Sequence, residues 1–242
     1  MGDVWSNDYT VVSPSLLKHS IGLFAPQFNN SQQHDAQELC AVLLDALHED
    51  TNKILEKPYV DMDIKGKHSE ERRAMITWQR HIKRHNSVIV DHFQGMQKSH
   101  LRCIKCSHES VKFDVFSSLS LPLPPMLGKS KVPLSSCFDE FISSEQLDTE
   151  NAWFCPKCST HVRAKKRLSL WSTPDILILH LKRFGSSRVD FISKKKGKKG
   201  MNTSKITDVI DFPVDKLDLG KYTNLPGSKG KNTSLCLLSC RP

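Results

Sequence analysis

The sequence has little of what marks fibrous, disordered, secreted or membrane-spanning chains. Its 242 residues include only 11 Gly and 12 Pro, too few for a collagen-like or low-complexity protein. The N-terminus, MGDVWSNDYT, has no basic region followed by an apolar core, so it does not resemble a secretory signal. The strongest apolar run, Ile176–Leu181, is far shorter than the ~20 residues that a membrane helix needs. We therefore expect a globular protein that is cytoplasmic and/or nuclear and does not contact a membrane.

The net charge of +9 is unevenly distributed. Residues 161–205 hold 13 Lys and Arg against two Asp, so this stretch is strongly basic and the remainder is slightly acidic. A basic segment of this kind raises the hypothesis of a zinc-ribbon protein that binds nucleic acid. The Lys-rich run Lys194–Lys199 contains no aromatic residue on which bases could stack, which disfavours that hypothesis. A solvated surface loop over 185–205 is the preferred interpretation.

Periodicity predicts helices in the first part of the chain and strands in the second. The segment after Ser31 predicts a capped amphipathic helix, with Ala36, Leu39, Cys40, Leu43 and Leu47 on its apolar face. A second helix is expected over residues 69–85. Alternation around Phe113 predicts a half-buried strand, and Ile176–Phe184 is apolar enough for a central strand. The sequence thus favours an α+β fold.

Four of the eight cysteines form two C-x-x-C pairs, Cys103/Cys106 and Cys155/Cys158. Each pair can place two thiolates about 2.3 Å from one zinc ion, and two pairs complete a tetrahedral site. Such closed four-cysteine sites are structural, because no position remains for a catalytic water. We expect one structural zinc ion per chain; three nearby histidines are alternative ligands, namely His100, His108 and His161.

Four segments, in order, resemble the ubiquitin-specific protease family, a family of ubiquitin carboxyl-terminal hydrolases. They are SQQHDAQELCAVLLDALHEDTNK (31–53), VIVDHFQGMQKSHLRCIKCSHESVKFDVFSSLSLPLP (88–124), WFCPKCSTHVRAKKRLSLWSTPDILILHLKRF (153–184) and VIDFPVDKLDL (209–219). The resemblance implies a papain-like cysteine protease fold with a thumb, a palm and zinc-ribbon fingers. The implied boundaries are a thumb remainder over 1–95, fingers over 96–175 and a partial palm over 176–242 that carries the basic loop 185–205.

The two catalytic motifs of that family are missing from this sequence. The family's nucleophilic cysteine precedes the 31–53 segment, whereas no cysteine precedes Cys40 here. The family's catalytic histidine follows the 209–219 segment, whereas no histidine follows His180. We therefore expect a family domain that is truncated at both ends, with no catalytic residue assigned. Core packing is the preferred interpretation of Cys40 and Cys137, and His180 is expected to be a hydrogen-bonded core histidine.

The resemblance also implies a binding role for the start of the first helix. Gln33, Asp35 and Glu38 would line the channel that receives the arginine-bearing tail of ubiquitin, with Asp35 and Glu38 as carboxylate partners of guanidinium groups. The alternative for these two acids is that they only complement the helix dipole. Two further hypotheses stay open: a shortened deubiquitinase whose parent hydrolyses ubiquitin C-terminal (iso)peptide bonds, and a catalytically dead protein that binds ubiquitin or ubiquitinated proteins. A truncated chain is expected to be weakly stable, with an exposed apolar edge near Ile176–Phe184.

Overall fold

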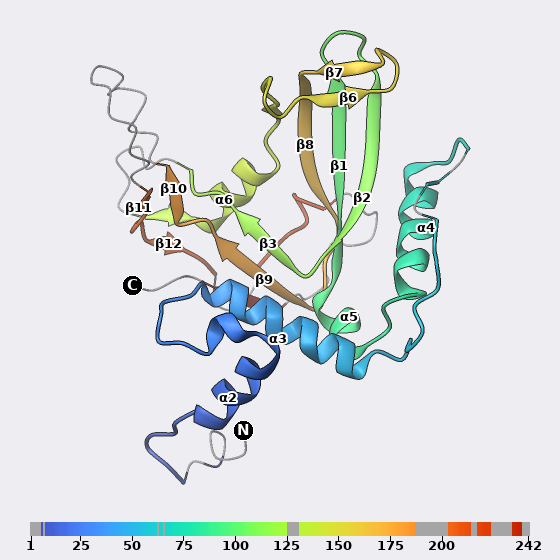
Figure 1. The fold of residues 1–242 in the computed structure, drawn as a ribbon. Helices are drawn as coiled ribbons and strands as arrows, with labels where there is room; N and C mark the ends of the chain where they lie inside the picture. Colours follow the sequence, from blue (N-terminus) through green and yellow to red (C-terminus); the bar gives the residue numbers. More distant parts are fainter. Residues whose placement is uncertain are drawn as a thin grey trace.

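The computed structural model shows a helical base from which a long β-ribbon projects (Figure 1). It describes residues 6, 8–61, 63–64, 66–124, 131–186, 203–213, 217–223 and 234–238. Figure 1 places α3 beneath the central strands and α4 beside the ribbon. Among the described residues, no helix combines the length and apolarity that crossing a membrane requires.

The helical base begins with α2 (Ser15–Phe24), the short η1 (Pro26–Phe28) and α3 (Ala36–Thr51). Helix α3 starts where the sequence predicts, because the Asp35 carboxylate accepts a hydrogen bond from the backbone N–H of Gln37. Helix α3 packs on α2 and η1 through a small apolar cluster. In this cluster, Leu39, Val42 and Leu43 of α3 contact Ile21, Ala25 and Phe28. Leu47, near the C-terminal end of the predicted apolar stripe, is 50% exposed, so the partners of α3 cover only part of that stripe.

Two further helices, α4 (Glu70–Ile82) and α5 (Val88–Phe93), follow a long connection. Each is capped by a serine side chain, Ser69 on α4 and Ser87 on α5. Helix α4 confirms the prediction for residues 69–85. Ala74 and Trp78 of α4 pack against an apolar cluster on the ribbon, which consists of Met96, Phe113 and Trp171.

The projecting ribbon is an antiparallel sheet in the order β2-β1-β8-β5. Its strands are β1 (Gly95–Cys103), β2 (Glu109–Phe116), β5 (Glu145–Gln146) and β8 (Ala164–Ser172). A second, two-stranded sheet of β6 (Trp153–Cys155) and β7 (Thr160–Val162) lies at its tip (Figure 1). Strand β8 incorporates the first part of the basic stretch, where Lys166 forms an ion pair with Glu145.

The core lies around a parallel three-stranded sheet in the order β13-β9-β3. Its strands are β3 (Ser118–Leu121), β9 (Ile176–Leu181) and β13 (Ser234–Leu238). Leu177, Leu179 and Leu181 of β9 are almost fully buried. The expected exposed edge near Ile176–Phe184 is therefore wrong, because β13 and β3 pair with β9 on its two sides.

Short elements complete this part of the molecule. Helix α6 (Leu134–Phe141) buries Phe138 against the ring of Tyr222, and β4 (Val132–Pro133) pairs in parallel with β12 (Ile210–Asp211). The predicted basic loop begins and ends in strands: β10 (Phe184–Ser186) pairs antiparallel with β11 (Thr203–Lys205). Backbone pairing needs no apolar pattern, so the sequence carried no signal for it. The rest of the loop, 187–202, lies outside the described residues.

Candidate functional site

The two C-x-x-C pairs meet at the tip of the β-ribbon. One pair follows β1, the other connects β6 to β7, and the four Sγ atoms all lie within 4.8 Å of one another. The Sγ atoms of Cys103 and Cys158 are 3.9 Å apart, and those of Cys106 and Cys155 are 3.6 Å apart. A tetrahedral ion bound at about 2.3 Å requires sulfur–sulfur distances of about 3.8 Å. The observed distances fit a metal ion held by all four thiolates.

Both pairs fold as matching turns. The residue after each second cysteine has a positive φ, 56° at Ser107 and 52° at Ser159. Its backbone N–H donates to the carbonyl of the first cysteine, at 3.1 Å to Cys103 and 2.8 Å to Cys155. The backbone N–H of Cys106 also lies 3.4 Å from the Cys103 Sγ, and this contact lowers the pKa of the Cys103 thiol to about 7. Both turns therefore hold the sulfurs together, and the first turn favours the thiolate form of Cys103, which metals bind.

The three histidines near the turns make other contacts. His100 lies 3.3 Å from the Glu109 carboxylate, His108 stacks on Trp153, and His161 meets Phe154 edge-on. Because the four cysteines already form a tetrahedral set, no histidine is needed as an alternative ligand.

A second polar site joins the start of α3 to the parallel sheet. Asp35 Oδ2 lies 3.5 Å from His180 Nε2 on β9, and His180 Nδ1 lies 3.2 Å from Ser120 Oγ on β3. The β3–β9 pairing places Ser120 directly opposite His180. Gln37 Nε2 donates to Ser118 Oγ at 3.4 Å, which adds a second link between α3 and β3.

The other two predicted binding residues flank this site. Gln33 and Glu38 are exposed, whereas the side chain of Asp35 is 32% exposed. All three lie at or just before the N-terminal end of α3. Asp35 combines helix capping with its contact to His180, which sequence patterns alone did not reveal.

Outside the tip cluster, the structure places the side chains of two further cysteines, Cys40 on α3 and Cys137 on α6. Cys137 is fully buried in α6, and burial raises the pKa of its thiol to about 11. Cys40 is half-buried on α3 and lines a cavity of about 400 Å³ together with Gln37 and Ser118. His180 lies on the central strand β9, and its two ring nitrogens contact Asp35 and Ser120. These contacts confirm the prediction that it is a hydrogen-bonded histidine.

Comparisons with known proteins agree with this architecture. The family model described as ubiquitin carboxyl-terminal hydrolase matches residues 1–236. Ubiquitin carboxyl-terminal hydrolase 2 of Gallus gallus is 35% identical over 213 residues, which cover 88% of this chain and 56% of that protein. Ubiquitin carboxyl-terminal hydrolase 21 of Homo sapiens is 33% identical over 249 residues, which cover 93% of this chain and 40% of that protein. The chain thus spans about half of these relatives or less.

A solved structure shares the fold. A chain of the SAGA Ubp8/Sgf11/Sus1/Sgf73 DUB module bound to ubiquitin aldehyde superposes with a TM-score of 0.56 at 22% identity, covering 90% of this chain and 39% of that chain. The helical base, the ribbon with its cysteine tip and the parallel sheet correspond to the α+β, papain-like fold expected from the sequence. The chain belongs to the ubiquitin carboxyl-terminal hydrolase family, as a member of its ubiquitin-specific protease group.

Proposed function

We propose that this chain binds ubiquitin through the surfaces of a deubiquitinase domain and does not hydrolyse ubiquitin conjugates by itself. The family reaction is thiol-dependent hydrolysis of (iso)peptide bonds at the C-terminus of ubiquitin. The family match over residues 1–236 is the observation that carries the binding part. A chain of similar fold in the DUB module, which was solved with ubiquitin aldehyde, supports the same partner.

The proposed inactivity of this chain is argued from the chemistry of cysteine proteases. Hydrolysis requires a thiolate, a histidine within hydrogen-bond reach and a group that orients the histidine. Four of the eight cysteines belong to the tip cluster, and the high pKa of Cys137 opposes thiolate formation. The sequence has no histidine beyond His180, whose two ring nitrogens face Asp35 and Ser120. The chain therefore offers a binding surface rather than a catalytic pair.

We assign recognition of the ubiquitin tail to Gln33, Asp35 and Glu38. A carboxylate at a helix start can accept charge-assisted hydrogen bonds from an arginine of the tail. The exposure of Gln33 and Glu38 leaves them accessible, and the His180 contact holds the Asp35 side chain against β9.

We assign one zinc ion to Cys103, Cys106, Cys155 and Cys158. Four thiolates are a donor set that selects zinc over hard cations such as Mg²⁺ and Ca²⁺. When bound, the ion would act structurally: it would tie the β6–β7 tip to the end of β1. It takes no part in hydrolysis, because the four ligands fill its coordination shell.

One experiment tests both parts of the proposal. Isotope-labelled chain 1–242 is titrated with ubiquitin and followed by NMR, and the same sample is incubated with a fluorogenic ubiquitin C-terminal amide. We expect saturable shifts at the start of α3 and no turnover above the rate without protein. Absence of shifts would refute ubiquitin binding, and turnover would refute inactivity. If turnover occurs, Cys40→Ala shows whether the thiol in the α3 cavity is responsible.

A further inference from the structure

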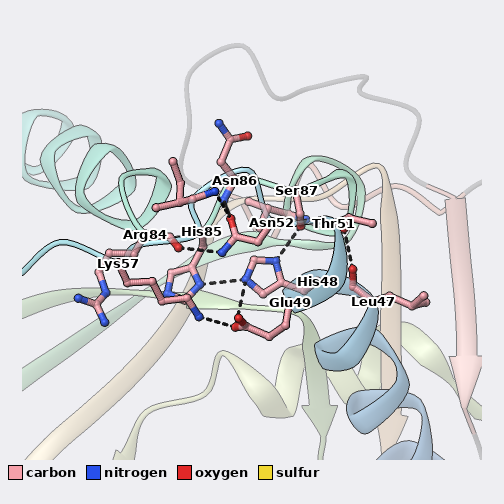
Figure 2. Close-up of polar contacts among 12 residues, drawn as sticks. Leu47, His48, Glu49, Thr51, Asn52, Lys57, Arg84, His85, Asn86 and Ser87 are labelled. Atoms are coloured by element: carbon pink, nitrogen blue, oxygen red, sulfur yellow. Dashed lines mark hydrogen bonds and ion pairs between the residues drawn. The ribbon is translucent and has the colours of Figure 1, made fainter. Parts of the chain in front are cut away.

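A second group of metal-ligating side chains lies at the opposite end of α3, where this helix meets the connection between α4 and α5. His48 and Glu49 come from the last turns of α3, and His85 comes from the residues after α4. Figure 2 shows the His48 ring between the His85 ring, the Glu49 carboxylate and the Ser87 hydroxyl. One nitrogen from each histidine and one carboxylate oxygen lie within 4.8 Å of one another.

The distances suit a first-row divalent ion. His48 Nε2 lies 3.0 Å from His85 Nδ1 and 3.9 Å from Glu49 Oε1. Ligands bound at about 2.0–2.1 Å with angles of about 90–110° are separated by about 2.9–3.4 Å. The two nitrogens already have this separation, because they share a hydrogen bond whose proton a metal ion would replace. The Glu49 side chain is half exposed, so a small rotation brings its oxygen into range.

The histidines are held by a set of outer contacts. Ser87 Oγ lies 2.7 Å from His48 Nδ1, so it can accept the Nδ1–H and leave the Nε2 lone pair directed at the site. Only 5% of the surface of His48 is exposed. The His85 ring stacks on His81 at 4.6 Å, and His81 Nε2 is fixed by Gln94 Oε1 at 2.7 Å.

The backbone around His85 is fixed to α3 as well. The Asn52 side chain, at the end of α3, donates to the carbonyl of Arg84 at 3.1 Å and accepts from the N–H of Asn86 at 2.9 Å. The N–H of Lys53 donates to the carbonyl of Asn86 at 2.9 Å. These bonds, visible in Figure 2 for Asn52, keep the ligand positions together without a metal. The positions of the two histidines are therefore set before a metal binds, and Glu49 alone has to move.

Lys57 competes with a metal for the Glu49 carboxylate only weakly. Lys57 Nζ lies 2.5 Å from Glu49 Oε1, with side-chain exposures of 29% and 50%. An ion pair of this exposure is weak, and the flexible lysine can withdraw into water when Glu49 turns to a metal.

We propose that His48, Glu49 and His85 form a second metal site, which takes a divalent transition-metal ion such as Zn²⁺, Co²⁺ or Ni²⁺ and is separate from the four-cysteine cluster. Two imidazoles and one carboxylate are a donor set that these ions favour, and water completes the shell. A bound ion links the end of α3 to the α4–α5 connection. The proposal does not depend on ubiquitin binding or on hydrolysis.

The test uses chain 1–242 with one zinc equivalent bound at the cysteine cluster. Co²⁺ is added while absorption is recorded, and total metal is measured after dialysis. We expect a second equivalent that gives ligand-field bands without new thiolate-to-cobalt charge transfer. Since loss of an outer contact alone weakens a metal site about 10- to 100-fold, His85→Gln and Glu49→Gln should each weaken this equivalent at least about tenfold.

His92→Gln is the matched control, because His92 is 51% exposed and contacts Asp175 away from the site. It should bind Co²⁺ as the unmodified chain does. His85 and Glu49 are at least partly exposed, so their glutamine variants should fold, which a melting curve checks. No second equivalent, an equal loss in His92→Gln, or charge transfer that reports cobalt at the cysteines would each overturn the proposal. None of these outcomes bears on ubiquitin titration, so the two proposals fail independently.

Discussion

Asp35 has two separable roles, and two substitutions distinguish them. Its carboxylate caps α3 by accepting from the Gln37 N–H at 2.8 Å, and its second oxygen faces His180 at the proposed tail-binding surface. Asp35→Ala removes both the cap and the charge. Asp35→Ser keeps a capping oxygen, because serine is as good an N-cap residue as aspartate, but it removes the charge.

The expected effects on stability differ between the two variants. Loss of a capping side chain costs about 0.5–2 kcal/mol, typically about 1 kcal/mol. For a domain of this size, about 1 kcal/mol corresponds to a fall of about 2–4 °C in Tm. Both variants lose the contact with His180 and only Asp35→Ala loses the cap, so Asp35→Ala should melt about 2–4 °C lower than Asp35→Ser.

The expected effects on ubiquitin binding are alike. A hydrogen bond to a charged group contributes about 1.5–3 kcal/mol, which is a factor of roughly 10–150 in Kd. Both variants should lose affinity for ubiquitin by this factor in calorimetric titrations at constant salt. Asp50→Asn is the matched control, because Asp50 is an exposed acid at the other end of α3, and it should leave the Kd unchanged.

The comparison of Asp35→Ser with Asp35→Ala decides between the two interpretations of this carboxylate. If Asp35→Ser binds ubiquitin as the unmodified chain does, the carboxylate serves only the helix, and the assignment of Asp35 to tail recognition is refuted. If Asp35→Ser melts as low as Asp35→Ala, the capping contribution derived from the Gln37 contact is refuted instead.

Three other predictions concern the tip, the core and a buried thiol. Removal of metal by a chelator, or Cys155→Ser, should abolish slow amide exchange at Val162 on the tip while the amide of Leu179 stays protected, because the ion joins only the tip turns. Leu179→Ala should lower the free energy of unfolding in urea by about 2–5 kcal/mol, against less than about 0.5 kcal/mol for the half-exposed Leu47→Ala. Burial raises the pKa of the Cys137 thiol from 9.0 to about 11. Between these pH values the thiol keeps its proton in the folded chain and loses it in the unfolded chain. The contribution of the buried thiol to the free energy of unfolding is therefore complete below pH 9.0 and declines as the pH rises toward 11. Alkylation of Cys137 at pH ~8.5 should therefore require denaturant, and rapid modification of the native chain would contradict this reasoning.

Features encoded by neighbouring residues were predictable from the sequence. The start of α3 follows from a capping aspartate before an apolar stripe, and α4 follows from Ser69 with two acids in its first turn. The four-cysteine cluster follows from C-x-x-C spacing, because each pair forms its own turn. These signals lie within short segments, so they can be recognised without knowledge of the tertiary fold.

Features that depend on distant pairing were missed. The prediction of an exposed edge at β9 was wrong because β13 pairs with this strand. The local sequence at 176–184 does not indicate that its partner strand lies at 234–238. The Asp35–His180 contact joins a helix start to a strand much later in the chain. His48 and His85 have no recognisable metal-binding spacing, and their approach to 3.0 Å results from the Asn52 bonds that fix the α4–α5 connection to α3.

Helix α3 is the element through which these missed contacts act together. Its N-terminal residues Asp35 and Gln37 contact β9 and β3, and its C-terminal residue His48 contacts the α4–α5 connection. A helix held at both ends by polar contacts transmits a change at one end as a small rigid shift at the other, since packed helices move as units. Binding of a metal at His48, Glu49 and His85 should then alter the position of Asp35 relative to β9. Ubiquitin affinity measured with and without Co²⁺, in the unmodified chain and in His85→Gln, would reveal this coupling as a change present only in the unmodified chain.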